Sequence, residues 1–114
     1  MVQNRNKLID FFVGNLSNAI VHTILEKAAG DNALLAKSYQ KESINSRNTA
    51  LHYRNMINPI YTYLPDRDID FIKKCLTQKV TSELKSRFFK KYEHIDLTLI
   101  KSSIDKALQD MKVI

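Results

Sequence analysis

Hydrophobic and polar residues alternate along the chain with the 3.6-residue period that is typical of amphipathic α-helices. The first predicted helix spans residues 4–29 and ends before Gly30. Its main apolar stripe consists of Ile9, Phe12, Val13, Leu16, Ile20, Ile24 and Ala28. A second apolar face consists of Leu8, Phe11, Val21 and Leu25. A helix that is apolar on two sides is either buried at the centre of a bundle or shared with a second molecule.

Three further helices follow, and the short connections between them favour antiparallel neighbours. Their predicted ranges are 32–57, 66–92 and 96–111, with Asp96 as the cap of the last helix. The segment 60–65 is the predicted hinge between the two halves of the chain, because Pro59 ends the second helix. We therefore expect an all-α, single-domain bundle of about four helices over residues 1–114.

The middle of the second predicted helix interrupts the apolar pattern. Residues 40–48 are polar apart from Ile44. This stretch indicates either a solvated helix middle or a break, in which Ser43 or Ser46 would cap a new helical start.

The first and third predicted helices resemble each other at an offset of sixty positions. The Ile-Asp-Phe of residues 9–11 recurs at residues 69–71, and the apolar positions that follow match at the same offset. A repeat of this length is typical of two related helical hairpins in tandem, here 5–57 and 65–114. The alternative is coincidence, because any two amphipathic helices share apolar residues at every third or fourth position.

The composition limits the class of protein. The chain is 44% hydrophobic and 26% charged, which matches an ordinary globular domain. It has only two glycines and two prolines, which disfavours an all-β fold with many tight turns. Cys75 is the single cysteine and cannot form an internal disulfide. With no secretory pattern and no run of about 18 apolar residues, we expect a cytoplasmic protein without a membrane span.

The formal charge of +6 favours contact with phosphate-rich or acidic partners. Basic residues crowd the third predicted helix. The candidate phosphate-contacting residues there are Lys85, Arg87, Lys90 and Lys91. Such contacts would give salt-sensitive binding that is independent of nucleic-acid sequence. Alternatively, the excess charge serves solubility, and positive residues in the last turns complement the helix dipole.

One short stretch of the second helix resembles a catalytic motif. Arg47 and His52 are separated by four residues, and Asn48 follows the arginine. This arrangement resembles the Arg-x4-His motif of HEPN ribonucleases, all-helical domains in which two copies meet to cleave RNA. The resemblance implies that Arg47 would hold the phosphate and His52 would assist proton transfer, with Asn48 in support. In that family the motif precedes the final helix, whereas here two predicted helices follow it.

No pattern indicates a metal, a cofactor or a small-molecule ligand. The three histidines and Cys75 do not stand at metal-ligand spacing. Gly14 and Gly30 are the only glycines, so the chain has no glycine-rich nucleotide loop. Gly14 lies inside the first predicted helix, where we expect it to allow the close approach of another backbone, either within the bundle or across a dimer.

The favoured interpretation is a non-enzymatic helical interaction or assembly module that self-associates, with a homodimer as the expected state. The first helix would supply the assembly surface through Phe11, Val21 and Leu25. Nucleic-acid binding through the third helix is the alternative, and HEPN-like ribonuclease activity is the third option.

Overall fold

The four predicted helices form in the predicted order. The computed structural model describes residues 4–58, 63–88 and 98–114, and no strand occurs within these ranges. The helices are α1 (Arg5–Ala28), α2 (Ala33–Ile57), α3 (Asp66–Phe88) and α4 (Leu99–Asp110). The prediction of an all-α bundle of about four helices is confirmed. The expected helix end at residue 92 and the expected cap at Asp96 lie outside the described residues.

Local sequence explains where α1 and α2 begin. Asn4, the N-cap of α1, accepts a hydrogen bond from the Asn6 amide at 2.8 Å. Asn32, the N-cap of α2, accepts one from the Leu35 amide at 3.1 Å. Asparagine at this position satisfies an amide that has no partner within the helix. Gly30 lies between the two helices with a φ of 57°, a conformation that glycine adopts without steric cost.

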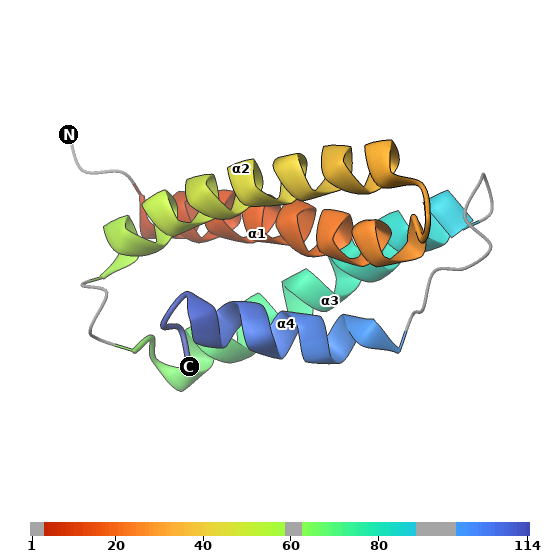
Figure 1. The fold of residues 1–114 in the computed structure, drawn as a ribbon. Coiled ribbons are helices and arrows are strands. Elements are labelled where there is room, and N and C mark those ends of the chain that lie inside the picture. Colours follow the sequence, from red (N-terminus) through yellow and green to blue (C-terminus); the bar gives the residue numbers. More distant parts are fainter. Residues whose placement is uncertain (1–3, 59–62, 89–97) are drawn as a thin grey trace.

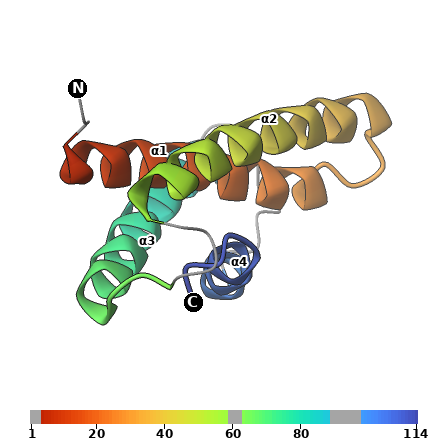
Figure 2. The same cartoon turned by 90° about the vertical axis from the view of Figure 1, so that its left-hand side faces the viewer.

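α1 is the central helix of the bundle. Its backbone lies close to those of α2, α3 and α4, whereas the backbone of α2 lies close to α1 alone among the described helices. Figure 1 shows the antiparallel α1/α2 hairpin above α3 and α4, with α3 running from the N-terminal end of α1 toward its C-terminal end. Figure 2 shows α3 crossing obliquely under this hairpin, with α4 viewed nearly end-on. The position of α1 between three neighbours explains why it is apolar on two sides.

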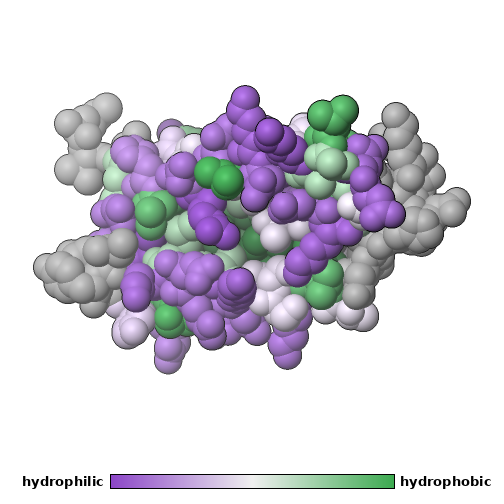
Figure 3. All heavy atoms as spheres, viewed as in Figure 1, coloured by the Kyte–Doolittle hydropathy of each residue, from purple (hydrophilic) through white to green (hydrophobic). Residues whose placement is uncertain are grey.

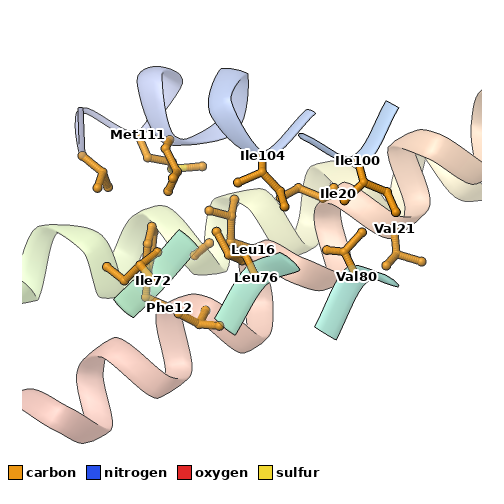
Figure 4. Close-up of a cluster of buried hydrophobic side chains, with 14 of the residues drawn as sticks. Phe12, Leu16, Ile20, Val21, Ile72, Leu76, Val80, Ile100, Ile104 and Met111 are labelled. Carbon is orange, nitrogen blue, oxygen red and sulfur yellow. The ribbon is translucent and has the colours of Figure 1, made fainter. Parts of the chain in front are cut away.

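The core forms from apolar residues repeated every four positions on α1 and α3, together with the inner face of α4. The α1 stripe consists of Phe12, Leu16, Ile20 and Ile24, the α3 stripe of Ile72, Leu76, Val80 and Leu84, and the α4 face of Ile100, Ile104 and Leu108, all buried. Figure 4 shows side chains from these three helices pointing toward one another. Burial of these side chains is the main favourable term that holds the helices together.

The second apolar face of α1 is buried apart from Phe11, and this corrects the assembly surface expected from the sequence. Val21 is 2% exposed and Leu25 is not exposed at all. Figure 4 places Val21 in the core cluster. Only Phe11 of the three expected surface residues is accessible, at 44% exposed. A helix that is apolar on both sides is either buried within the chain or shared with a second molecule. For Val21 and Leu25 the structure shows burial within the chain.

One of the two expected roles of Gly14, the close approach of another backbone within the bundle, does not occur. A Cβ atom added at Gly14 would have no atom within 4 Å, apart from its own helix backbone and chain neighbours, so no other element of this chain approaches it closely. The residue lies on the exposed side of α1.

A polar seam joins α1 to the middle of α2. The α2 helix is continuous through residues 40–48, and Ser43 and Ser46 are buried in it rather than capping a new start. The Ser43 hydroxyl donates to the Ala19 carbonyl at 3.0 Å, and Asn18 Nδ2 donates to the Ser46 hydroxyl at 2.5 Å. Ile44, the apolar residue of this stretch, is instead 50% exposed. Small hydroxyl side chains let the two helices approach closely while their polar atoms remain hydrogen-bonded.

α1 is long and apolar enough to cross a membrane, judged by length and composition alone. This corrects the expectation that no stretch of the chain reaches such a length. In the structure 56% of its most apolar window is buried inside the protein. Contact with three neighbouring helices accounts for these apolar residues, as is typical of the core helix of a bundle.

Candidate functional site

Among the described residues, four of the six exposed large hydrophobic side chains lie at one end of the bundle, on the first half of α1, the last turns of α2, the segment before α3 and the start of α3. The other two, Leu34 and Ile44, lie elsewhere on α2. The apolar end patch consists of Phe11, Tyr53, Met56, Tyr63 and Phe71; Tyr53 is half-buried and the other four are exposed. Phe11 packs on Tyr53 with ring centroids 5.1 Å apart. Phe71 is 50% exposed. Exposed apolar groups gathered on one part of a protein are typical of interaction surfaces.

Phe11 and Phe71 lie on either side of an exposed strip of α1. Phe71 lines a groove between α3 and α1 together with Asn6 and Asp10. Phe11 follows Asp10 in the helix and is turned by about 100° from it, toward α2. The two phenylalanines occupy equivalent positions of the proposed repeat, and both remain accessible.

Charges of both signs surround the apolar end patch. The exposed charged residues on these turns are Lys7, Asp10, Asp66, Arg67 and Asp70. Beside them, Arg5 forms an ion pair with Asp68 at 2.5 Å, which fastens the start of α1 to the start of α3. The patch itself is therefore close to neutral, in a protein whose formal charge is +6.

A larger groove lies between α3 and α4. It has a volume of about 830 Å³. Its lining consists of Lys73, Thr77, Thr81 and Lys85 on α3 and of Thr98, Ile100, Lys101, Ile104 and Asp105 at and within α4. We call this site the α3/α4 groove. Its charged lining residues are mostly basic, while the two isoleucines are buried beneath them.

The structure divides the basic residues of the third helix among different sides. Lys85, one of the four candidate phosphate-contacting residues, lines the α3/α4 groove. The side chain of Arg87 and the residues Lys90 and Lys91 lie outside the part of the chain that the structure describes. Lys73 joins Lys85 in the groove, although residues twelve positions apart are turned by about 120° around a helix, so the sequence alone did not bring these two lysines to one site.

The residues of the Arg-x4-His motif do not converge within one chain. Arg47, Asn48 and His52 are all exposed, and Arg47 lies in the interior of α2. Five positions in a helix turn a side chain by about 140°, so Arg47 and His52 point to different sides. Arg47 lines a cavity of about 170 Å³ between α1, α2 and α4. His52 instead packs beside Tyr53, with ring centroids 5.4 Å apart.

Figure 3 views the face on which the α1/α2 hairpin meets α4. Hydrophilic residues dominate it, with apolar residues visible in the hollow between the two layers. Lys27 and Lys106 line the same cavity as Arg47, beside the carboxylate of Asp110.

Sequence reasoning missed Arg54, the largest fully buried side chain of the described residues. Its Nε donates to the Met111 carbonyl at 2.9 Å and its Nη2 to the Lys112 carbonyl at 2.8 Å. Its Nη1 donates to both oxygens of Asn58, the C-cap of α2. Burial lowers the pKa of this guanidinium from its ordinary value, which is high enough that the group remains charged at neutral pH. Arg54 therefore joins the C-terminal ends of α2 and α4, where a positive charge complements both helix dipoles.

The turn at the C-terminal end of α4 explains why the Met111 and Lys112 carbonyls face Arg54. Lys112 has a φ of 60°, and the Val113 amide donates to the Leu108 carbonyl at 2.9 Å. The Lys112 amide donates to the Gln109 carbonyl at 3.1 Å. These bonds form a Schellman turn, which reverses the chain and buries Val113 against the bundle.

Within residues 4–58, 63–88 and 98–114, no three His, Cys, Asp or Glu side chains stand close enough to hold a metal ion. Cys75 is a half-buried free thiol. His22 is held at 2.8 Å from the Asn18 carbonyl and packs against Tyr39. Its contacts are those of a packing residue.

The chain matches no protein-family model, no curated protein and no solved structure at a significant level.

Proposed function

We propose that this protein is a non-enzymatic helical interaction module that self-associates through the apolar end patch. The observation that carries the proposal is the gathering of Phe11, Tyr53, Met56, Tyr63 and Phe71 at one end of the bundle. Aromatic and methionine side chains are enriched in the buried centres of protein interfaces. Phe11 is held in place by its contact with Tyr53, so burying it against a partner would cost little side-chain entropy.

A second copy of the chain is the partner that the surrounding charges favour. In a twofold interface the same patch faces itself, so a patch with both signs can place each charge opposite its complement. Asp10, Asp66 and Asp70 stand on these turns beside Lys7 and Arg67. The remainder of the chain is strongly basic, so repulsion between two copies is smallest when they meet at this end. A cytoplasmic location is part of the proposal, because the lone free thiol of Cys75 suits a reducing compartment.

The test is the oligomeric state of purified protein, measured by sedimentation velocity over a wide range of concentration. We expect a dimer for the natural protein and weaker association by about 30-fold for Phe71→Ser, because an interface anchor is worth about 2 kcal/mol. Ile44→Ser is the matched control, since Ile44 is also 50% exposed but lies on the outer face of α2.

Two results would contradict the proposal. A natural protein that remains monomeric at every concentration would exclude self-association. A dimer that is weakened by Ile44→Ser and unaffected by Phe71→Ser would move the interface to the outer face of α2.

A further inference from the structure

The α3 wall of the α3/α4 groove is an oblique row of polar side chains, because each step of four residues turns by about 40° around the helix. Lys73, Thr77, Thr81 and Lys85 follow one another at intervals of four residues and all line the groove. Twelve residues of α-helix extend over about 18 Å, which sets the distance along the helix axis between the two lysines. The row therefore offers positive charge at both ends and hydroxyl groups between them.

The α4 wall adds to the positive potential. Lys101 stands on this wall, and Asp105 is the one acidic residue among the lining residues. The groove thus carries three ammonium groups against one carboxylate. Within the described residues no ion pair neutralises Lys73, Lys85 or Lys101, since the ion pairs there involve Asp68.

The helix dipole of α4 also adds to the positive potential in the groove. The N-terminal half of α4 lines the groove, and its first turn contains no acidic residue. The N-terminal end of a helix carries a partial positive charge, which favours a bound anion. Beneath these polar groups, Ile100 and Ile104 provide an apolar floor.

We propose that the α3/α4 groove binds the phosphate backbone of a single-stranded nucleic acid without sequence preference. Lysine ammonium groups and the hydroxyl of Thr81 are of the kind that donates to phosphate oxygens, whereas the Thr77 hydroxyl already donates to the Lys73 carbonyl at 2.7 Å. An extended row of positive charge follows a backbone that is charged at every nucleotide, and the apolar floor can receive sugar or base surface. The concave shape between two helices suits one strand better than a duplex, whose phosphates lie on a convex cylinder.

The size of the groove is adequate for such a ligand. Its volume of about 830 Å³ lies within the range of about 300–1,000 Å³ that is typical of ligand sites. The groove lies on the side of α3 that faces α4, whereas Phe71 of the apolar end patch lies on the side of α3 that faces α1. Nucleic-acid binding and self-association therefore use different surfaces, and either proposal can fail without the other.

The experiment is fluorescence anisotropy of a labelled oligo(U) strand titrated with the full chain at several salt concentrations, with a labelled duplex for comparison. Three phosphate contacts predict that log affinity falls with log salt concentration with a slope of about −2 or steeper for a single strand. Binding should then be about 20-fold weaker at 200 mM salt than at 50 mM salt. We expect the duplex to bind more weakly than the single strand.

Four lysines of α3 supply matched variants. Lys73→Gln and Lys85→Gln alter the groove, and each should weaken binding while reducing the salt slope by about 0.7. Lys74→Gln and Lys79→Gln remove the same charge from the same helix outside the groove lining, and should change binding much less. Asp105→Asn removes the opposing carboxylate and should tighten binding.

Several outcomes would overturn the proposal. Equal weakening by all four lysine variants would show that net charge alone attracts the strand. Equally tight binding of a polyglutamate peptide of the same charge would replace nucleic acid with acidic peptides as the ligand class. Binding that does not respond to salt, or tighter binding of the duplex, would also exclude the proposed site. Unchanged thermal unfolding of each variant, followed by circular dichroism, verifies that the fold is intact.

Discussion

α1 and α3 carry the same buried stripe and differ on the adjoining face. Phe12, Leu16, Ile20 and Ile24 in α1 correspond, sixty positions on, to Ile72, Leu76, Val80 and Leu84 in α3, and all eight are buried. The adjoining row of α1 consists of Val13, Ser17, Val21 and Leu25, which are also buried. The corresponding row of α3 consists of Lys73, Thr77, Thr81 and Lys85, which line the α3/α4 groove.

The difference explains the position of each helix in the bundle. A helix with two apolar rows can bury both, so α1 occupies the centre and contacts three neighbours. A helix with one apolar row buries that row and leaves its polar row facing water or a ligand, so α3 lies at the edge. Positions sixty residues apart are therefore core residues in one helix and candidate ligand contacts in the other.

Replacing a residue of one row with its counterpart in the other row should have the largest effect on stability. Leu25→Lys places a charge at a fully buried site, and we expect it to destabilise the protein by more than about 4 kcal/mol or to prevent folding. Lys85→Leu changes an exposed position, and we expect stability to change by less than about 0.5 kcal/mol. Urea unfolding followed by circular dichroism measures both. A folded Leu25→Lys variant of near-normal stability would show that this row of α1 is not core.

Truncating a leucine in the buried stripe of α1 or of α3 should destabilise the protein by a similar amount. Leu16 and Leu76 are equivalent and almost fully buried, so Leu16→Ala and Leu76→Ala should each cost about 2–5 kcal/mol through lost burial and a new cavity. Chemical unfolding of the two variants gives the comparison directly. A cost at Leu76 of below about 1 kcal/mol, with a normal cost at Leu16, would mean that α3 is not packed as tightly as α1.

Gly14→Ala should give the smallest effect, in the stabilising direction. Gly14 is an exposed helical position where an added Cβ meets no atom, and alanine favours the helix by about 1 kcal/mol over glycine. Gly30→Ala is the control, because the φ of 57° at Gly30 strains any residue with a Cβ and should destabilise the protein. Thermal unfolding distinguishes the two signs. Destabilisation by Gly14→Ala would indicate a close contact at Gly14, as an interface with another copy would create.

Much of the fold could be predicted because it depends on local sequence. The 3.6-residue period gave the helices, and capping asparagines together with Gly30 and Pro59 placed their boundaries to within a few residues. The candidate site could be predicted less well from the local pattern. The periodicity found Phe11 as an off-stripe residue, yet it could not separate Phe11 from Val21 and Leu25, because all three are apolar and lie off the main stripe.

The sequence by itself determined the helices and the buried stripes, since backbone hydrogen bonds and side-chain periodicity depend on residues three or four positions apart. Only the tertiary structure decided which polar residues are buried. Ser43 is buried because α1 lies against it, and Arg54 because carbonyl groups 57 and 58 positions away turn toward it. Burial of a polar group is favourable only where a distant part of the chain supplies its hydrogen-bond partner, and no local pattern encodes that partner.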